Sequence, residues 1–268
     1  MRKIKIYGKS PYSIALIHGG PGAPGSLTPL AEELSSFHGI LELFQSEDSL
    51  EGQVHELKSL LEKHGDHPIT LVGHSWGAWL SFIFASRYPQ ITKKIILVGS
   101  GPFKEEYAAK IAQIRLERLS DKEKKKVRFL EKELLDPDIH NKDRIFSGFG
   151  DLISRIDTYK PIPMKKKKLK CSYHVFKKVW KEAAQLRKSG ELLKLGKKIQ
   201  CPVLALHGDY DPHPAEGVKE PLSSVLKEFR FILLKNCGHE PWMEEEAREE
   251  FLRILKDELK ISGEDHNA

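Results

Sequence analysis

The chain has 268 residues, of which 40% are hydrophobic and 31% are charged. This apolar fraction is large enough to form a core, which excludes wholesale disorder, and the length suits one or two domains. The longest uninterrupted apolar runs, such as Ile14–Ile17, span four residues, whereas a membrane-spanning helix needs about 20. We therefore expect no transmembrane segment.

The formal net charge of +6 conceals an uneven distribution. Residues 101–200 carry 27 basic and 14 acidic residues, a net charge of +13, and the remainder of the chain carries −7. Such a change indicates a boundary. The basic peaks, Lys124–Lys126 and Lys165–Lys168, lack the interleaved aromatic residues of a nucleic-acid-binding motif, so solvated helix faces explain them better. We expect neither nucleic acid nor a membrane as a partner.

The cysteines and the N-terminus indicate the compartment. Cys171, Cys201 and Cys237 are odd in number and far apart, a pattern that fits neither a disulfide framework nor a zinc site. The basic segment Met1–Lys5 is not followed by an apolar stretch of signal-peptide length. We therefore expect reduced thiols in a cytoplasmic protein.

Strand and helix patterns alternate through the first hundred residues. Residues 3–7, 12–17, 40–44, 68–72 and 95–98 resemble strands, and helical patterns lie between them. Ser49 is placed to cap one of these helices. Ala78–Ala85 is apolar nearly all round, which predicts a helix buried in the core. Strands that alternate with helices favour a parallel sheet with right-handed crossovers.

This alternation is interrupted in the middle of the chain. From Pro102 to about Lys198 the sequence shows helical periodicity and lysine-rich stretches but no convincing strand. Strand patterns return at 202–206 and 229–234. We predict an α/β fold whose core comprises residues 1–100 and 201–268, interrupted by a helical, lysine-rich insertion at residues 101–200.

A final helix follows the last strand pattern. We expect Glu244–Glu246 in its first turn, where acidic side chains complement the helix dipole. Its apolar positions, which predict the buried face, are Ala247, Phe251, Ile254 and Leu255.

Gly73-His74-Ser75-Trp76-Gly77 follows a compact apolar strand and precedes the apolar helix, which is the pattern of a nucleophile elbow. A serine at such a sharp turn has a strained backbone, and its neighbours two residues away approach each other closely, so glycine fits there. The hydroxyl is then exposed at a helix N-terminus, where developing negative charge is favoured. Ser75 is therefore a candidate nucleophile.

A serine hydroxyl needs a base, and the base needs a carboxylate to orient it. Asp209 and Asp211 come just after one apolar strand, and His239 comes just after the next. The order Ser, Asp, His is the one expected for a nucleophile elbow. Catalytic groups in open parallel sheets gather at the carboxyl ends of strands, so we expect these side chains to meet.

A glycine-rich turn, His18-Gly19-Gly20-Pro21-Gly22, also follows a strand. Such a turn can place one backbone N–H opposite the N–H that follows the serine, and two such donors hold the oxyanion of a tetrahedral intermediate. We predict that the amides of Gly20 and Trp76 form this oxyanion hole. The other histidines near the site, His74, His207 and His213, are interpreted as loop hydrogen-bonders, because no second ligand lies at metal spacing.

Together, the turn at residues 18–22, the elbow at 73–77, the motif at 207–211 and Gly238-His239-Glu240-Pro241-Trp242 resemble the α/β-hydrolase superfamily, in the branch related to proline iminopeptidases. The resemblance covers residues 1–100 and 201–260. It implies Ser75 as the nucleophile, Asp211 rather than Asp209 as the acid, and His239 as the base, with no cofactor. The insertion corresponds to the family's helical cap, which shapes the substrate pocket.

The resemblance leaves three functions open. The first is a serine hydrolase acting on a small ester, amide or thioester. The second is a proline iminopeptidase, which holds the free amine of its substrate with cap carboxylates; nothing in this basic insertion singles out such a pair, so an esterase or another acyl hydrolase is favoured. The third is a non-catalytic binding protein on the same fold. The expected partner is a small-molecule acyl substrate.

Overall fold

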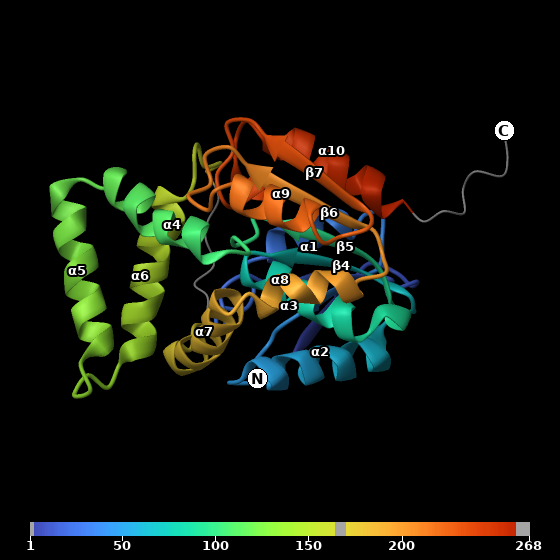
Figure 1. Ribbon diagram of the computed structural model, residues 1–268, viewed down its shortest axis with the longest axis horizontal. Coiled ribbons are helices and arrows are strands. Elements are labelled where there is room, and N and C mark those ends of the chain that lie inside the picture. The colour runs from blue at the N-terminus through green and yellow to red at the C-terminus, as the bar shows by residue number, and fades with distance from the viewer. Residues whose placement is uncertain (1–2, 164–169, 261–268) are drawn as a thin grey trace, which may run out of the picture.

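The structure is a computed structural model that describes residues 3–163 and 170–260 (Figure 1). Seven strands form one sheet in the order β1-β3-β2-β4-β5-β6-β7. Only the β1–β3 pair is antiparallel among the described strands. The predicted mostly parallel α/β fold is confirmed. The strands are β1 (Ile4–Tyr7), β2 (Ile14–Ile17), β3 (Ile40–Leu43), β4 (Ile69–His74), β5 (Thr92–Val98), β6 (Val203–Gly208) and β7 (Phe229–Leu234).

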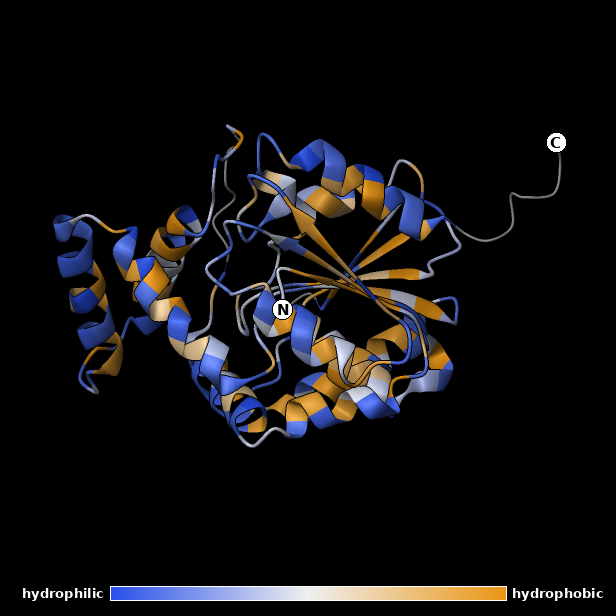
Figure 2. Cartoon of the chain, turned by 45° about the horizontal axis from the view of Figure 1, so that its top comes forward, coloured by the Kyte–Doolittle hydropathy of each residue, from blue (hydrophilic) through white to orange (hydrophobic). Residues whose placement is uncertain are grey.

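Helices cover both faces of the sheet. Successive residues of a strand point to opposite faces, so an apolar strand contributes side chains to a core on each face. Ala15 and Ile17 of β2 join the core beneath one set of helices, whereas Ile14 and Leu16 join the other core. Figure 2 shows the apolar strands between these two layers. The first layer contains α2 (Leu50–His64), α3 (Trp76–Arg87) and α9 (Glu216–Ser223), and the second contains α1 (Thr28–Leu34) and α10 (Arg248–Leu259).

Two local predictions about the helices of the first layer are confirmed. The Ser49 side chain accepts a hydrogen bond from the Gly52 N–H at 3.1 Å and caps α2. In α3, every residue from Trp76 to Ser86 is buried. This helix runs through the core directly behind the predicted elbow.

The chain between β5 and β6 is helical, as the sequence predicts. In Figure 1, α5 and α6 form a hairpin that stands beside the sheet, with α7 between it and the sheet layers. The lysine run at 165–168 lies outside the described residues. The helices of this segment are α4 (Glu105–Glu117), α5 (Asp121–Leu135), α6 (Lys142–Ile156), α7 (Tyr173–Lys188), α8 (Glu191–Lys194) and the 3₁₀ helix η2 (Leu195–Lys198). Within the described ranges, no helix is both long enough and apolar enough to cross a bilayer.

The prediction that Glu244–Glu246 begin the last helix is wrong. α10 starts at Arg248, and its first turn contains Glu249 and Glu250. Glu244 is instead fully buried before the helix. Its Oε1 accepts hydrogen bonds from the N–H groups of Gly238 and Tyr159 at 2.7 and 2.9 Å, and its Oε2 accepts one from the Lys160 N–H at 2.7 Å. This carboxylate therefore joins the end of the helical segment to the loop after β7.

Candidate active site

Ser75 occupies the sharp turn between β4 and α3. Its φ of 52° and ψ of −112° lie in a region that non-glycine residues rarely adopt. The flanking glycines permit this turn: a Cβ atom on Gly73 would lie 2.2 Å from the Gly77 carbonyl oxygen, and one on Gly77 would lie 2.1 Å from the Ile17 carbonyl oxygen. The predicted elbow geometry is therefore present, with Ser75 half-buried at its tip.

Asp211 and His239 meet in the loops that follow β6 and β7. The His239 Nδ1 lies 2.7 Å from the Asp211 Oδ2. Asp209 faces elsewhere, since its Oδ1 accepts a hydrogen bond from the Cys237 N–H at 3.3 Å and its Oδ2 lies 3.6 Å from the Lys235 Nζ. Of the two aspartates that follow β6, the structure thus brings Asp211 to the histidine.

Charge and burial act against each other in this pair. Burial alone would raise the pKa of Asp211, but attraction to His239, His213 and His207 holds that pKa well below its ordinary value. Burial alone would lower the pKa of His239, but the neighbouring Asp211 carboxylate outweighs this and raises it. An ionised Asp211 can only accept, so the proton of neutral His239 is on Nδ1, and its Nε2 is free to act as a base.

The end of β5 lies between Ser75 and His239. The Ser75 N–H donates to the Val98 carbonyl at 2.9 Å. Gly99, which follows Val98, is so close to His239 that an added Cβ would lie 3.2 Å from the His239 Nδ1. On the other side, the His74 Nε2 lies 3.0 Å from the His239 carbonyl oxygen. Among the described residues, no hydrogen bond joins the Ser75 hydroxyl to His239. Such bonds are often long in unliganded enzymes.

The glycine-rich turn lies against the elbow. A Cβ on Gly19 would lie 3.1 Å from the Ser75 Cβ, and Gly20 has a φ of 62°, which glycine adopts without strain. Within the described ranges, the structure records no hydrogen-bond acceptor for the N–H of Gly20 or of Trp76. One of these N–H groups therefore follows Ser75 in the elbow, and the other lies in the turn packed against it.

Buried His18 holds this turn from behind. The Gln45 N–H donates to the His18 Nε2 at 3.2 Å, which leaves the proton on Nδ1, and Nδ1 lies 2.9 Å from the Gly19 carbonyl oxygen. Burial lowers the pKa of His18 to about 4. Neutral His18 therefore holds the peptide group between Gly19 and Gly20, which carries the Gly20 N–H.

The helical segment contacts both sides of the site. The Ser172 N–H, at the start of α7, donates to the Gly22 carbonyl at 2.7 Å. The His239 N–H donates to the carbonyl of Asp157 at 2.9 Å, at the end of α6. The Asp157 carboxylate is buried and is held by Arg115 of α4, whose Nε and Nη2 lie 2.9 and 2.5 Å from its oxygens.

The interpretation of His213 as a loop hydrogen-bonder is confirmed, but the sequence did not reveal its partner. That partner is Asp211 itself: the His213 Nδ1 lies 2.7 Å from the Asp211 Oδ1. Its ring also stacks on that of His239, with centroids 4.5 Å apart. Its position two residues after the acid was the available signal.

One cluster of potential metal ligands includes these residues. One ligand atom from each of Asp211, His213 and His239 lies within 4.8 Å of the others. Both imidazoles already hydrogen-bond to the carboxylate. The cluster is therefore satisfied as a hydrogen-bonded group, and these contacts provide no evidence for a metal.

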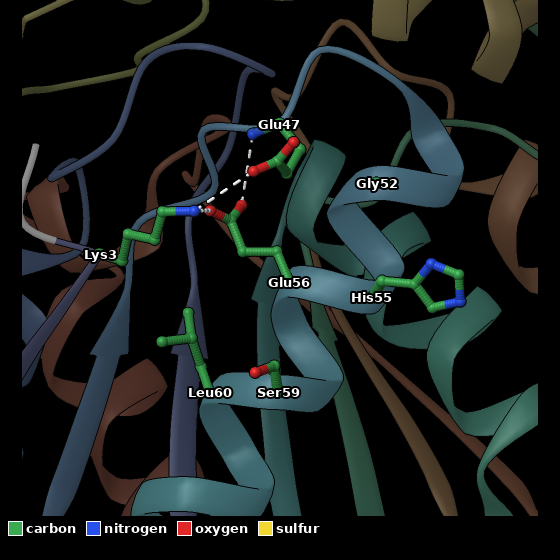
Figure 3. Close-up of a pocket in the computed structure, with 7 residues that line it drawn as sticks. All are labelled: Lys3, Glu47, Gly52, His55, Glu56, Ser59 and Leu60. Atoms are coloured by element: carbon green, nitrogen blue, oxygen red, sulfur yellow. Dashed lines mark hydrogen bonds and ion pairs between the residues drawn. The ribbon is translucent and has the colours of Figure 1, made fainter.

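A surface hollow beside α2 is a separate feature (Figure 3). Its lining includes Lys3, Glu47 and Glu56, and the Lys3 Nζ lies 2.8 Å from the Glu56 Oε1 and 3.2 Å from the Glu47 Oε1. The charges that line this hollow therefore pair with one another. None of the proposed catalytic side chains lines it.

Comparisons with known proteins agree with this architecture. The curated proline iminopeptidase of Saccharolobus solfataricus is 25% identical over 276 residues, covering 91% of this chain and 84% of the relative. An alpha/beta fold family hydrolase from Bacillus anthracis superposes with a TM-score of 0.69 at 15% identity, covering 96% of this chain and 94% of that one. Est816, described as an N-acyl homoserine lactone degrading enzyme, gives 0.62 at 15% identity and 95% coverage of both chains.

The family comparison covers most of the chain. The family described as alpha/beta hydrolase fold matches residues 45–246. This range includes the elbow, both loops that carry Asp211 and His239, and the helical segment between them. The chain therefore belongs to the alpha/beta hydrolase fold family and is a hydrolase.

Proposed function

We propose that the protein is a serine hydrolase that cleaves a small ester, amide or thioester through an acyl-enzyme intermediate on Ser75. The observation that carries this proposal is the 2.7 Å hydrogen bond between Asp211 and His239 beside a strained serine elbow. The proposed triad is Ser75, His239 and Asp211, and no cofactor takes part in the proposed reaction.

In the proposed reaction, the Ser75 Oγ attacks the substrate carbonyl carbon and its proton passes to the His239 Nε2. The N–H groups of Gly20 and Trp76 donate to the oxyanion that forms. The tetrahedral intermediate then collapses, and His239 gives the proton to the leaving group. Water, deprotonated by the same histidine, attacks the acyl-enzyme and releases the acid together with free Ser75.

We further propose that residues 101–200 act as the cap over this site. Contacts from α7 to the Gly22 turn and from the end of α6 to the His239 loop support this role. A cap that touches both the oxyanion turn and the base is placed to select the acyl group. We also propose a cytoplasmic location, which rests on the sequence.

The second candidate is proline iminopeptidase activity, which the name of the Saccharolobus relative favours. Recognition of a free amine needs a carboxylate with spare charge. The buried carboxylate of Asp157, at the end of α6 beside the His239 loop, is already neutralised by hydrogen bonds from the Arg115 Nε and Nη2. We therefore place esters and other activated acyl compounds before N-terminal prolyl amides.

A substrate panel distinguishes the candidates. Purified protein is assayed with nitrophenyl esters of increasing acyl length, an acyl thioester and the chromogenic amide of proline, with Ser75→Ala as the matched control. We expect ester turnover that Ser75→Ala abolishes. Preferential release from the prolyl amide would instead establish the peptidase, and no turnover of any substrate would support the binding protein.

A further inference from the structure

Two histidines, rather than one, bind the carboxylate of Asp211. The His239 Nδ1 lies 2.7 Å from Oδ2, and the His213 Nδ1 lies 2.7 Å from Oδ1. The backbone N–H of His213 also donates to Oδ1, at 2.9 Å. Each carboxylate oxygen thus has its own imidazole hydrogen-bond partner, while the His207 Nε2 lies farther away, 3.7 Å from Oδ2, and the side chain of Asp211 is fully buried.

The protonation of His213 follows from these contacts. Asp211 is ionised, because its pKa lies well below the ordinary value, so it can only accept. Desolvation lowers the pKa of His213 to about 4, against the opposing effect of Asp211. His213 is therefore neutral at working pH, and its single proton is on Nδ1, where it donates to Asp211.

The remaining contacts fix the His213 ring in place. The His213 carbonyl is 2.7 Å from the Nε2 of buried His207, which holds the backbone. The ring lies over that of His239 at a centroid distance of 4.5 Å and an interplanar angle of 25°. One side chain therefore contacts both the acid and the base of the proposed triad.

We propose that His213 is a positioning residue of the catalytic site, holding the Asp211 carboxylate in the one rotation that presents Oδ2 to His239 and withdrawing part of its charge. This inference rests on the proposed serine hydrolase function. Without the Nδ1–H donor, Oδ1 keeps only the backbone N–H of His213, so the carboxylate is held less firmly and more of its charge acts on His239. Within the described residues, other charged or titratable groups that act on the Asp211–His239 pair include His74, His207, Asp157 and Arg115.

Three substitutions distinguish the effect of the His213 Nδ1–H donor from the effect of its stacked ring. His213→Asn keeps a donor nitrogen near the place of Nδ1 but removes the ring, His213→Phe keeps a stacked ring but removes the donor, and His213→Ala removes both. We expect kcat of the Phe and Ala variants to fall about tenfold or more, as for loss of a hydrogen bond to a charged group, with KM changed less than about twofold. The Asn variant should retain most of the activity.

The pH profile tests for an effect beyond structure. Removal of the donor leaves more negative charge on Asp211, which stabilises protonated His239, so the acid limb of kcat/KM should move to higher pH in the Phe variant. It should not move in the Asn variant. A residue that only supports the fold would lower the rate at every pH without moving this limb.

Two controls make the outcomes distinguishable. His55→Asn changes an exposed histidine of α2 and should leave kcat and the pH profile unchanged. Wild-type reactivity with a fluorophosphonate reports on the proposed function alone. If the wild type reacts and turns over ester while His213→Phe matches it in rate and pH profile, or if Asn and Phe lose activity equally, the role of His213 is refuted. If the wild type itself neither reacts nor turns over, the proposed function has failed.

Discussion

Glu244 joins the loop that carries His239 to the end of the helical segment, and Glu244→Ala tests the strength of this connection. The substitution removes the acceptor of three backbone N–H groups, those of Gly238, Tyr159 and Lys160. An unpaired buried donor costs about 1–3 kcal/mol. The Gly238 N–H is buried, whereas Tyr159 and Lys160 are exposed residues whose N–H groups can turn to water. We expect a loss of about 3 kcal/mol in unfolding free energy, mostly from Gly238.

For a chain of this size, that loss corresponds to a fall in Tm of about 5 °C. His239 is the residue after Gly238, so its position should loosen as well, and kcat should fall between about tenfold and a hundredfold. Thermal unfolding followed by circular dichroism and ester turnover below Tm measure the two effects. Glu244→Gln keeps one oxygen acceptor and should lie between the wild type and Glu244→Ala.

Glu245→Ala is the matched control, because it removes only an exposed ion pair with Lys160, with Nζ 3.3 Å from Oε1. Exposed pairs contribute about 0–1 kcal/mol, so Tm and kcat should stay close to the wild type. If Glu244→Ala behaves like Glu245→Ala in both measurements, Glu244 does not hold the catalytic loop.

Three further predictions follow from the site. Gly77→Ala places a Cβ 2.1 Å from the Ile17 carbonyl oxygen and 2.7 Å from that of His18, so we expect little folded protein by circular dichroism; a stable, active variant would contradict the elbow packing. Activity requires neutral His239, whose pKa is raised by Asp211 above the ordinary 6.5, so kcat/KM should fall with decreasing pH through a value above 6.5, and a limb below 6.5 would oppose this. Burial lowers the pKa of His18 to about 4. The contribution of this shift to the free energy of unfolding, about 3 kcal/mol, is present above pH 6.5 and is lost as the pH falls toward 4. Urea unfolding of wild type and His18→Asn across this range should show a weaker pH dependence in the variant, and identical slopes would refute it.

Much of the fold could be predicted because its signals are local. Strand β2 is a short apolar run, and α3 is apolar all round because it is buried on every side. The glycines at 73 and 77 indicated the elbow because any side chain there would collide with backbone. The three proposed catalytic residues could be named because each follows an apolar strand, and parallel strands end at the same edge of the sheet.

The residues that the sequence did not reveal depend on long-range contacts. Glu244 looked like a helix-start residue, since acidic residues are common there, but two of its three N–H partners, Tyr159 and Lys160, lie about 85 residues earlier in the chain. The pairing of Arg115 with Asp157 spans 42 residues and two helices. His213 is close to Asp211 in sequence, but its stacking on His239 depends on the approach of two separate loops.

The reaction of Ser75 with a fluorophosphonate tests most directly whether three distant residues act on one hydroxyl. Labelling rates are measured by intact mass for the wild type, His239→Ala and Asp211→Asn, and the labelled residue is located by peptide mapping. We predict one label on Ser75 in the wild type, none in Ser75→Ala, and rates reduced by at least about a hundredfold in the other two variants. A label elsewhere, or equal rates in all folded variants, would contradict the triad.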